Sequence, residues 1–274
     1  MTINVTFWGV RGSLPCCSEE HIEFGGNTSC VQIDLDGRIV VIDAGSGIRM
    51  LGNKLFEQNR NDLVLLISHT HWDHILGFPF FSPIYEKTAD IDIYAPTQPD
   101  GKKTEEIFAT LMSTPLFPLP LHAVPSALHF HDFTPSEVFD LFDGKVKMKT
   151  TLLTHPNGAA GYRLEYDGKA ICYISDYEHG KKEDFERLAA FVQNSDMMIY
   201  DAMYTPEEYP QFVGWGHSTW EEAALLTKAA NVKKTALFHH APLHTDSLMR
   251  KIEQEAQKAD PRLFAAKEYV TLSL

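Results

Sequence analysis

The sequence has few cysteines and no long apolar run, which excludes several classes of protein. Its four cysteines, Cys16, Cys17, Cys30 and Cys172, form neither a C-x-x-C pair nor a regular disulfide framework. No apolar run approaches the roughly 20 residues that a membrane-spanning helix needs. The N-terminal stretch "MTINVTFWGVRGS" lacks the basic start and apolar centre of a secretory signal. We therefore expect a cytoplasmic protein with free thiols and no membrane partner.

The chain is also short of basic residues. It has 24 Lys and Arg against 37 Asp and Glu, a formal net charge of -13. Because long nucleic acids are held mostly through phosphate contacts to Lys and Arg, this balance argues against such a partner. A small anionic substrate drawn to a bound cation remains compatible with it.

The composition and pattern predict one globular domain over residues 1–274. Hydrophobic residues make up 44% of the chain and charged residues 22%, and we find neither a linker nor a short repeat. Apolar runs predict strands at 3–9, 29–35, 38–43, 62–68, 91–96, 145–153, 160–166, 169–175, 197–202 and 235–240. Helical patterns cover 48–58, 102–112, 183–192, a segment that begins at a capping box of Ser218 and Glu221, and 246–259. Two strand-rich halves that both carry helices suggest an α/β protein with two sheets face to face and helices outside.

Residues 113–135 differ from the rest of the chain. They are rich in proline and aromatic residues, show no clean period and contain no Lys or Arg. Long irregular segments within a domain are often lids or binding loops, and the alternative is a plain surface connection. The sequence leaves both interpretations open.

The stretch "ISHTHWDH" carries the strongest chemical signal. It places three histidines and an aspartate, His69, His71, Asp73 and His74, within six residues directly after the apolar run "LVLLI". In α/β proteins the ends of buried strands commonly carry the functional side chains. This spacing predicts a metal site at the end of a strand.

Further metal-capable side chains follow other predicted strands. His155 lies in "LLTHP", Asp176 in "CYISDYEH", and His239 and His240 in "ALFHH". A carboxylate has two oxygens, so Asp176 can bridge two cations about 4 Å apart. The residues therefore indicate a binuclear site.

The chain strongly resembles the metallo-β-lactamase-fold hydrolases in "FWGVRGS", "DAGSG", "SHTHWDHILGFP", "LLTHP", "YISD" and "LFHH". The resemblance implies a four-layer αββα sandwich with two divalent cations. Zinc is the first expectation, and manganese or iron are the alternatives. The resemblance assigns one ion to His69, His71 and His155 and the second ion to Asp73, His74 and His239. It makes Asp176 the ligand that bridges the two ions. His240 is the alternative to His239, which we prefer because it directly follows the apolar run "TALF".

The segments "IYDAMY" and "GWGHSTWEEAALLTKAANVKKTALFHH" resemble the tRNase Z and phosphodiesterase branch of that family. By this resemblance His217 acts near the leaving group, oriented by Asp201, and the catalytic candidates are Asp73, His217 and Asp201. The alternative role of His217 is that of a neighbour to the helix cap at Ser218.

Substrate contacts are predicted on two further segments. Asn27, Thr28 and Ser29 of "FGGNTSC" could bind a phosphate, although a tight turn before a strand explains them equally well. Arg163 in "GYR" is another candidate anion contact. Asp43 in "DAGSG" is expected to orient a ligand histidine rather than to bind metal.

The resulting hypothesis is a hydrolase that cleaves a small phosphodiester, such as a cyclic nucleotide, with a hydroxide formed between two cations. The alternatives are a tRNA 3′-processing endonuclease, a hydrolase of a lactone or thioester, and a non-catalytic binding protein. Relatives of this kind are often dimers, so a homodimer is a further expectation.

Overall fold

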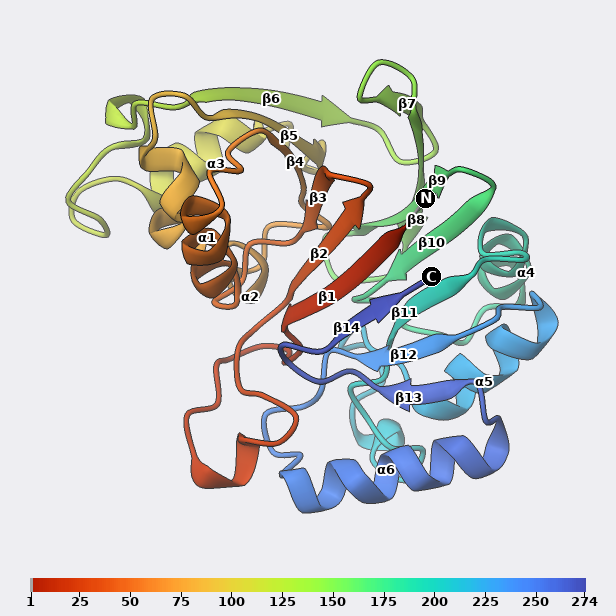
Figure 1. Ribbon diagram of the computed structural model, residues 1–274. Helices are drawn as coiled ribbons and strands as arrows, with labels where there is room; N and C mark the ends of the chain where they lie inside the picture. Colours follow the sequence, from red (N-terminus) through yellow and green to blue (C-terminus); the bar gives the residue numbers. More distant parts are fainter. Residues whose placement is uncertain (1) are drawn as a thin grey trace.

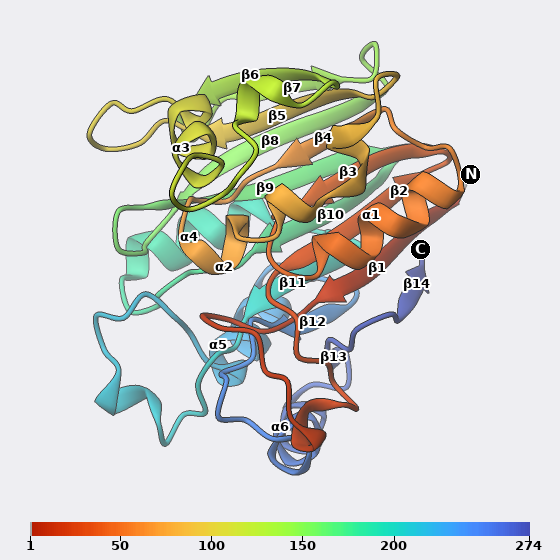
Figure 2. The same ribbon diagram turned by 90° about the vertical axis from the view of Figure 1, so that its left-hand side faces the viewer.

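In the computed structural model, which describes residues 2–274, the chain forms two seven-stranded sheets packed face to face (Figures 1 and 2). The first sheet has the order β14-β1-β2-β3-β4-β5-β6. Its strands are β1 Ile3–Gly9, β2 Cys30–Leu35, β3 Arg38–Ile42, β4 Leu63–Leu66, β5 Asp90–Pro96, β6 Ala127–Phe133 and β14 Thr271–Ser273. The second sheet has the order β13-β12-β11-β10-β9-β8-β7. Its strands are β7 Val138–Leu141, β8 Val146–Leu153, β9 Ala159–Tyr166, β10 Lys169–Ile174, β11 Met197–Asp201, β12 Thr235–Phe238 and β13 Leu263–Ala265.

Helices cover the outer face of each sheet. The helices α1 Ile48–Glu57, α2 Trp72–Ile75 and α3 Thr104–Leu111 lie on the first sheet, and α4 Lys182–Phe191, α5 Trp220–Ala229 and α6 Asp246–Ala259 on the second (Figure 1). Short 3₁₀ turns occur at Glu19–His21, Phe78–Phe80, Ser82–Tyr85, Leu121–Ala123 and Tyr209–Gln211. The arrangement is the expected four-layer αββα sandwich.

The apolar side chains form three layers of core that hold these elements together. Between the sheets, Phe7 of β1 and Phe238 of β12 are fully buried with ring centroids 6.1 Å apart. Outside the second sheet, α6 buries Met249, Ile252 and Ala256, which the helical period places on one face. Burial of apolar area on this scale is the main force that stabilises such a sandwich.

The prediction for residues 113–135 is partly wrong. The second half of the segment forms β6, which pairs in parallel with β5 over seven residue pairs. Its alternating pattern of half-buried and exposed residues suits an edge strand, and the flanking prolines obscured that pattern in the sequence. The first half remains irregular.

The predicted cap of α5 is also wrong by one residue. The N-cap is Thr219, whose hydroxyl accepts a hydrogen bond from the backbone N–H of Glu222 at 3.4 Å. Ser218 is turned inward instead, with its hydroxyl 3.0 Å from the hydroxyl of Tyr200 and 2.9 Å from Nδ1 of His179. These buried partners compete with the capping contact.

The topology brings five strand ends to one edge of the sandwich. Strands β3, β4 and β5 are parallel, as are β10, β11 and β12. Strand β8 runs in the direction of β10, because β9 is antiparallel to both. The carboxyl ends of β4, β8, β10, β11 and β12 therefore meet, and each strand ends at or is followed by one of the predicted site residues.

Among the described residues no helix has the length and apolarity required to cross a bilayer. All four cysteines are free, and Cys30 and Cys172 are buried.

Candidate metal centre

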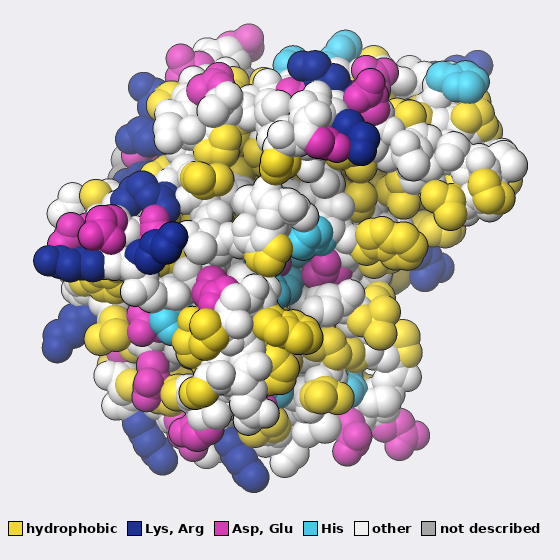
Figure 3. All heavy atoms as spheres, turned by 180° about the vertical axis from the view of Figure 1, so that it is seen from behind, with side chains coloured by type: hydrophobic (Ala, Val, Ile, Leu, Met, Phe, Trp, Pro, Cys, Tyr) yellow, Lys and Arg dark blue, Asp and Glu magenta, His cyan; other side chains and the backbone are white. Residues whose placement is uncertain are grey.

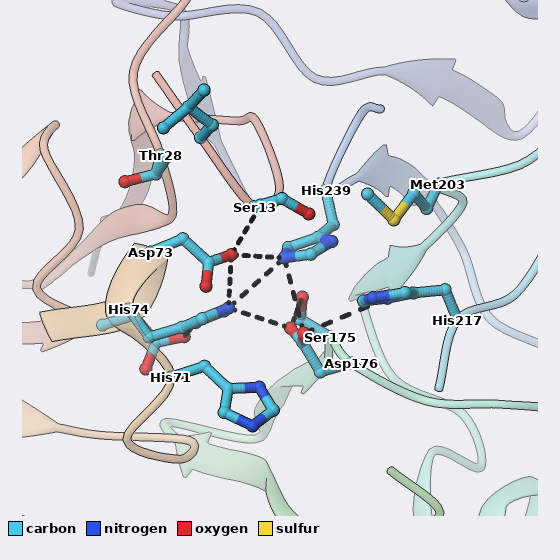
Figure 4. A network of polar contacts seen from close by, with 12 residues as sticks. Ser13, Thr28, His71, Asp73, His74, Ser175, Asp176, Met203, His217 and His239 are labelled. Atoms are coloured by element: carbon cyan, nitrogen blue, oxygen red, sulfur yellow. Dashed lines mark hydrogen bonds and ion pairs between the residues drawn. The ribbon is translucent and has the colours of Figure 1, made fainter. Parts of the chain in front are cut away.

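The histidines and aspartates of the predicted metal site converge at the common strand edge. Figure 4 shows His71, Asp73, His74, Asp176 and His239 with their polar groups directed toward one another. The site combines the loop after β4, the loop after β8 that carries His155, and the first residues after β10 and β12. Every predicted ligand belongs to this cluster.

One half of the cluster contains Asp73, His74 and His239. The Nε2 atoms of His74 and His239 lie 3.3 Å apart, and Oδ2 of Asp73 lies 3.3 Å from the first and 3.2 Å from the second. Asp176 closes this group, with Oδ2 at 3.2 Å from His74 Nε2 and Oδ1 at 3.4 Å from His239 Nε2. Four side chains thus surround one small space.

The other half contains His69, His71 and His155, whose ligand atoms all lie within 4.8 Å of one another. Nε2 of His155 faces Nδ1 of His71 at 3.1 Å. Oδ1 of Asp176 lies 3.8 Å from His69 Nε2 and 3.7 Å from His155 Nε2. Asp176 therefore reaches both halves, as a bridging carboxylate must.

The residues fit two divalent cations. Among residues 2–274, Nε2 of His69 is one of the buried polar atoms without a hydrogen-bond partner, and it faces the other ligand atoms. Buried polar groups are normally satisfied, so an orphaned nitrogen in a group of nitrogens and carboxylates indicates a ligand. Imidazole and carboxylate ligands suit zinc, manganese and iron.

The pKa shifts also differ between the two halves of the cluster. Burial lowers the pKa values of His69, His71 and His155, which favours the neutral imidazoles that metal binding requires. Burial alone would raise the pKa of Asp73, but His74 and His239 hold it far below its usual range. Burial opposes protonation of His239 too, yet Asp176 and Asp73 raise its pKa to about 9. The two carboxylates therefore require positive charge beside them, which a divalent cation supplies.

Asp43 orients His74, as the sequence predicts. Its Oδ2 lies 2.7 Å from Nδ1 of His74 and accepts a 2.7 Å hydrogen bond from the hydroxyl of Tyr173. The backbone N–H of Ser68 donates to Oδ1 at 2.7 Å. This fully buried carboxylate fixes the ring so that Nε2 points into the cluster.

Glu178 is a supporting residue that the sequence analysis missed. Its carboxylate accepts hydrogen bonds from the backbone N–H of Gly214 at 2.6 Å and of Gly216 at 2.8 Å. Gly216 in turn accepts from His155 Nδ1 at 2.9 Å. Gly216 has φ +90°, and a Cβ there would overlap the ring of His155. The only signal in the sequence is the place of Glu178 two residues after Asp176, which is too weak to separate it from other acidic residues.

His217 and Asp201 form the predicted pair beside the cluster. Nδ1 of His217 lies 2.8 Å from Oδ2 of Asp201 and 4.0 Å from Oδ1 of Asp176. The His217 ring stacks against His239 with centroids 4.9 Å apart. Asp201 is fully buried and also accepts hydrogen bonds from the backbone N–H groups of Asp176 and Met203, both at 3.0 Å. The pair is therefore rigidly held, and it leaves Nε2 of His217 as the nitrogen that can exchange a proton with a bound molecule.

The structure places His239, and not His240, in the cluster. Nε2 of His240 donates to the carbonyl of Ala266 at 2.9 Å, on the side away from the ligands. The backbone at Asp43, Asp176 and His239 has φ values of +63°, +61° and +61°. Side chains other than glycine rarely adopt this left-handed conformation, and such strain concentrates at functional sites.

The predicted substrate contacts are not brought to the cluster in the same way. Asn27 donates to Oε2 of Glu268 at 3.0 Å, and Thr28 Oγ1 accepts from the backbone N–H of Ser46 at 2.8 Å. Ser29 is fully buried just before β2, and among the described residues its hydroxyl has no hydrogen-bond partner. The interpretation as a tight turn therefore explains the contacts of Asn27 and Thr28. Arg163 lies on β9 and donates to Glu165 at 2.7 Å and to the carbonyl of Phe191 at 3.1 Å. The structure thus gives Arg163 a role in joining β9 to the end of α4, and we no longer include it among the substrate contacts.

Comparison with known proteins agrees with this geometry. Residues 38–240 match the family described as the beta-lactamase superfamily domain. A ribonuclease Z of Azobacteroides pseudotrichonymphae genomovar. CFP2 is 24% identical over 279 residues, which cover 88% of this chain and 91% of that protein.

Two solved structures share the architecture. The metallo-beta-lactamase fold protein YhfI from Bacillus subtilis superposes with a TM-score of 0.75 at 18% identity, covering 100% of this chain and 99% of that chain. A diphosphatase from the PhnP family superposes with a TM-score of 0.72 at 18% identity, covering 98% and 97%. At these identities the likeness shows the fold alone.

Proposed function

The chain belongs to the beta-lactamase superfamily and has the metallo-β-lactamase fold, and from this premise we propose that it is a metal-dependent phosphodiesterase that cleaves small phosphodiesters. The observation that carries the proposal is the His217–Asp201 pair, with Nδ1 and Oδ2 2.8 Å apart beside the metal ligands. A phosphodiester expels an alkoxide, which is a poor leaving group unless it receives a proton. The His217–Asp201 pair is positioned to donate that proton.

The ligands would hold two cations, one at His69, His71 and His155 and one at Asp73, His74 and His239, with Asp176 shared. When bound, such ions supply Lewis acidity toward phosphate oxygens and lower the pKa of a water between them. Asp73 also accepts a hydrogen bond from the backbone N–H of Ser13 at 2.8 Å, which fixes its carboxylate in the position of a ligand. Asp73 would therefore contribute to catalysis as a ligand of the metal.

The chain's own residues perform the proton transfer. Asp201 holds the proton of His217 at Nδ1 and stabilises the charged imidazolium, as a buried carboxylate does beside a catalytic histidine. Nε2 of His217 then donates its proton to the oxygen that leaves. General acid catalysis of this kind contributes about 10²–10⁴-fold to the rate.

A second candidate function is endonucleolytic processing of tRNA 3′ ends. It is favoured by the similarity to a ribonuclease Z over most of both chains. Against it stand the net charge of -13 and the absence of Lys and Arg from residues 113–135, since RNA binding relies on basic contacts. We therefore rank it second. We further propose a cytoplasmic location and a homodimer.

A substrate panel tests the proposal. Metal-reconstituted protein is assayed with bis(p-nitrophenyl) phosphate, a cyclic nucleotide, a lactone, a thioester and a tRNA precursor, with Asp176→Ala as the inactive control. We expect turnover of the diesters and no turnover of the lactone or thioester. Cleavage of the tRNA precursor without activity on small diesters would favour the second candidate instead.

A further inference from the structure

One cavity borders the metal centre at His69 and His71, and a second cavity adjoins the first. The first has a volume of about 330 Å³ and is lined by His69, His71, Gln98, Lys102, Ile107 and Asn157 among others. The second has a volume of about 610 Å³, and we call it the Trp72 trough; its lining includes Trp72, Lys102, Ile107, Thr110, Leu111 and Leu116. Lys102 and Ile107 line both, so the trough lies next to the cavity that contains the ligand histidines.

The Trp72 trough exposes apolar surface at the edge of a polar site. Trp72 is 76% exposed and Leu116 62% exposed. Trp72 begins α2, directly after the ligand His71 and before the ligand Asp73, so the metal centre itself fixes its backbone. Figure 3 shows hydrophobic side chains bordering the hollow in which histidine and acidic side chains are visible. A large rigid aromatic ring in this place offers a flat face to a bound molecule.

The position of His217 determines which part of the substrate enters the trough. Within the part of the chain that the structure describes, neither cavity includes His217 in its lining. His217 serves the leaving oxygen in the proposed reaction, so the trough receives the substituent that stays on the phosphorus. Lys102 lines both cavities, and its ammonium group is paired with Asp100 at 2.8 Å.

We propose that the substrate is a phosphodiester whose retained substituent carries a flat aromatic group, such as a nucleobase, which stacks on Trp72 in this trough. The proposal rests on the proposed function and names the substrate class of the same site. A nucleobase stacked on an aromatic side chain gains about 1–3 kcal/mol, which corresponds to roughly 5- to 150-fold in affinity. The first half of residues 113–135 contributes Leu116 to the trough, which gives that irregular segment a part in binding.

Two diesters with the same leaving group test the proposal. Thymidine 5′-(p-nitrophenyl phosphate) carries a base on the retained substituent, and methyl p-nitrophenyl phosphate does not. For the metal-loaded enzyme we expect kcat/KM to favour the thymidine diester by at least about fivefold. Trp72→Ala should abolish that preference, and Trp72→Phe should retain part of it.

Two further variants serve as controls. Phe56→Ala, a 50% exposed aromatic at the end of α1, should leave the preference unchanged. Trp215 is 61% exposed and lies near His217 in sequence. If Trp215→Ala abolished the preference and Trp72→Ala did not, the proposal would be overturned.

A binding measurement separates this proposal from the proposed function. Calorimetric titration of the metal-loaded protein compares adenosine 5′-monophosphate with ribose 5-phosphate and needs no turnover. Tighter binding of the nucleotide that disappears in Trp72→Ala supports the trough, even if no diester is hydrolysed. Equal binding of the two compounds would contradict it, as would a wild-type dimer that Trp72→Ala converts to a monomer, because a second copy would then cover the ring.

Discussion

Nδ1 of His217 lies 2.8 Å from Oδ2 of Asp201, and Asp201 also accepts hydrogen bonds from the backbone of Asp176 and Met203. Because Asp201 is fully buried and engaged on both oxygens, it can hold only one orientation of the His217 ring. The contact thereby links His217, the proton donor, to Asp201 at the end of β11, the strand that follows Asp176 in the chain.

Replacing Asp201 by Asn should impair proton transfer without removing metal. The amide would place an N–H where the His217 proton is now accepted, so the ring would adopt the wrong tautomer. We expect kcat for a diester with an alkoxide leaving group to fall by at least about 100-fold. Elemental analysis should find the same metal content as in wild type, and a loss of metal would assign Asp201 to coordination instead.

Glu178→Gln should weaken metal binding through His155. The Glu178 carboxylate holds Gly216, whose carbonyl accepts the Nδ1 proton of His155. Changes to such supporting residues typically cost about 10–100-fold in metal affinity. Titration with zinc measures this affinity, and Glu183→Gln, an exposed residue of α4, is the matched control. A fall in thermal stability with unchanged zinc affinity would give Glu178 a purely structural role.

Metal removal should lower both activity and stability. Dialysis against a chelator removes the cations that offset the charges of Asp73 and Asp176, and ligands that bind only the folded state stabilise it by mass action. We expect the melting temperature to rise by several degrees when zinc or manganese is restored, roughly as 1–3 kcal/mol of added stability predicts. In Asp176→Ala the added metal should raise it much less. An equal rise in the variant would show that the ions bind elsewhere.

Lowering the pH should weaken the contacts of Asp184, which hold Thr154, the residue before His155, in place. The Arg187 guanidinium beside it holds the pKa of Asp184 below its usual value of 3.8, and Asp184 accepts a hydrogen bond from Thr154 at 2.9 Å. A lowered pKa means that the contribution is present above pH 3.8 and is lost as the pH falls below that value. Because the pair is partly exposed, Asp184→Asn should cost only about 1 kcal/mol at pH 7 and almost nothing near pH 2. Urea unfolding of wild type and Asp184→Asn at the two pH values measures the loss of unfolding free energy at each. Equal losses at pH 7 and pH 2 would contradict a contribution from the ionised carboxylate of Asp184.

Much of the metal centre could be predicted from the sequence because its ligands are marked locally. His69, His71, Asp73 and His74 stand in one short motif, and His155, Asp176 and His239 each follow an apolar strand. The parallel order of the strands then brings these ends together. The choice of His239 over His240 also follows from its place directly after β12.

Other features depend on contacts that no local pattern encodes. Arg163 is a cationic side chain of the kind that contacts anions, but its partner Phe191 lies 28 residues away and becomes a neighbour only when α4 packs beside β9. Glu178 acts through a backbone loop 36 to 38 residues away. The three-residue strand β14 pairs with β1 at the opposite end of the chain, and such a short segment has no readable period.

The most direct test of the account compares His217→Ala with wild type on two diesters that differ only in the leaving group. One releases p-nitrophenolate, which leaves readily without a proton, and the other releases an alkoxide, which needs one. If His217 is the proton donor, kcat for the alkoxide diester should fall by about 10²–10⁴-fold and that for the p-nitrophenyl diester much less. Equal losses on both diesters, or activity confined to lactones and thioesters, would contradict the proposed phosphodiesterase mechanism.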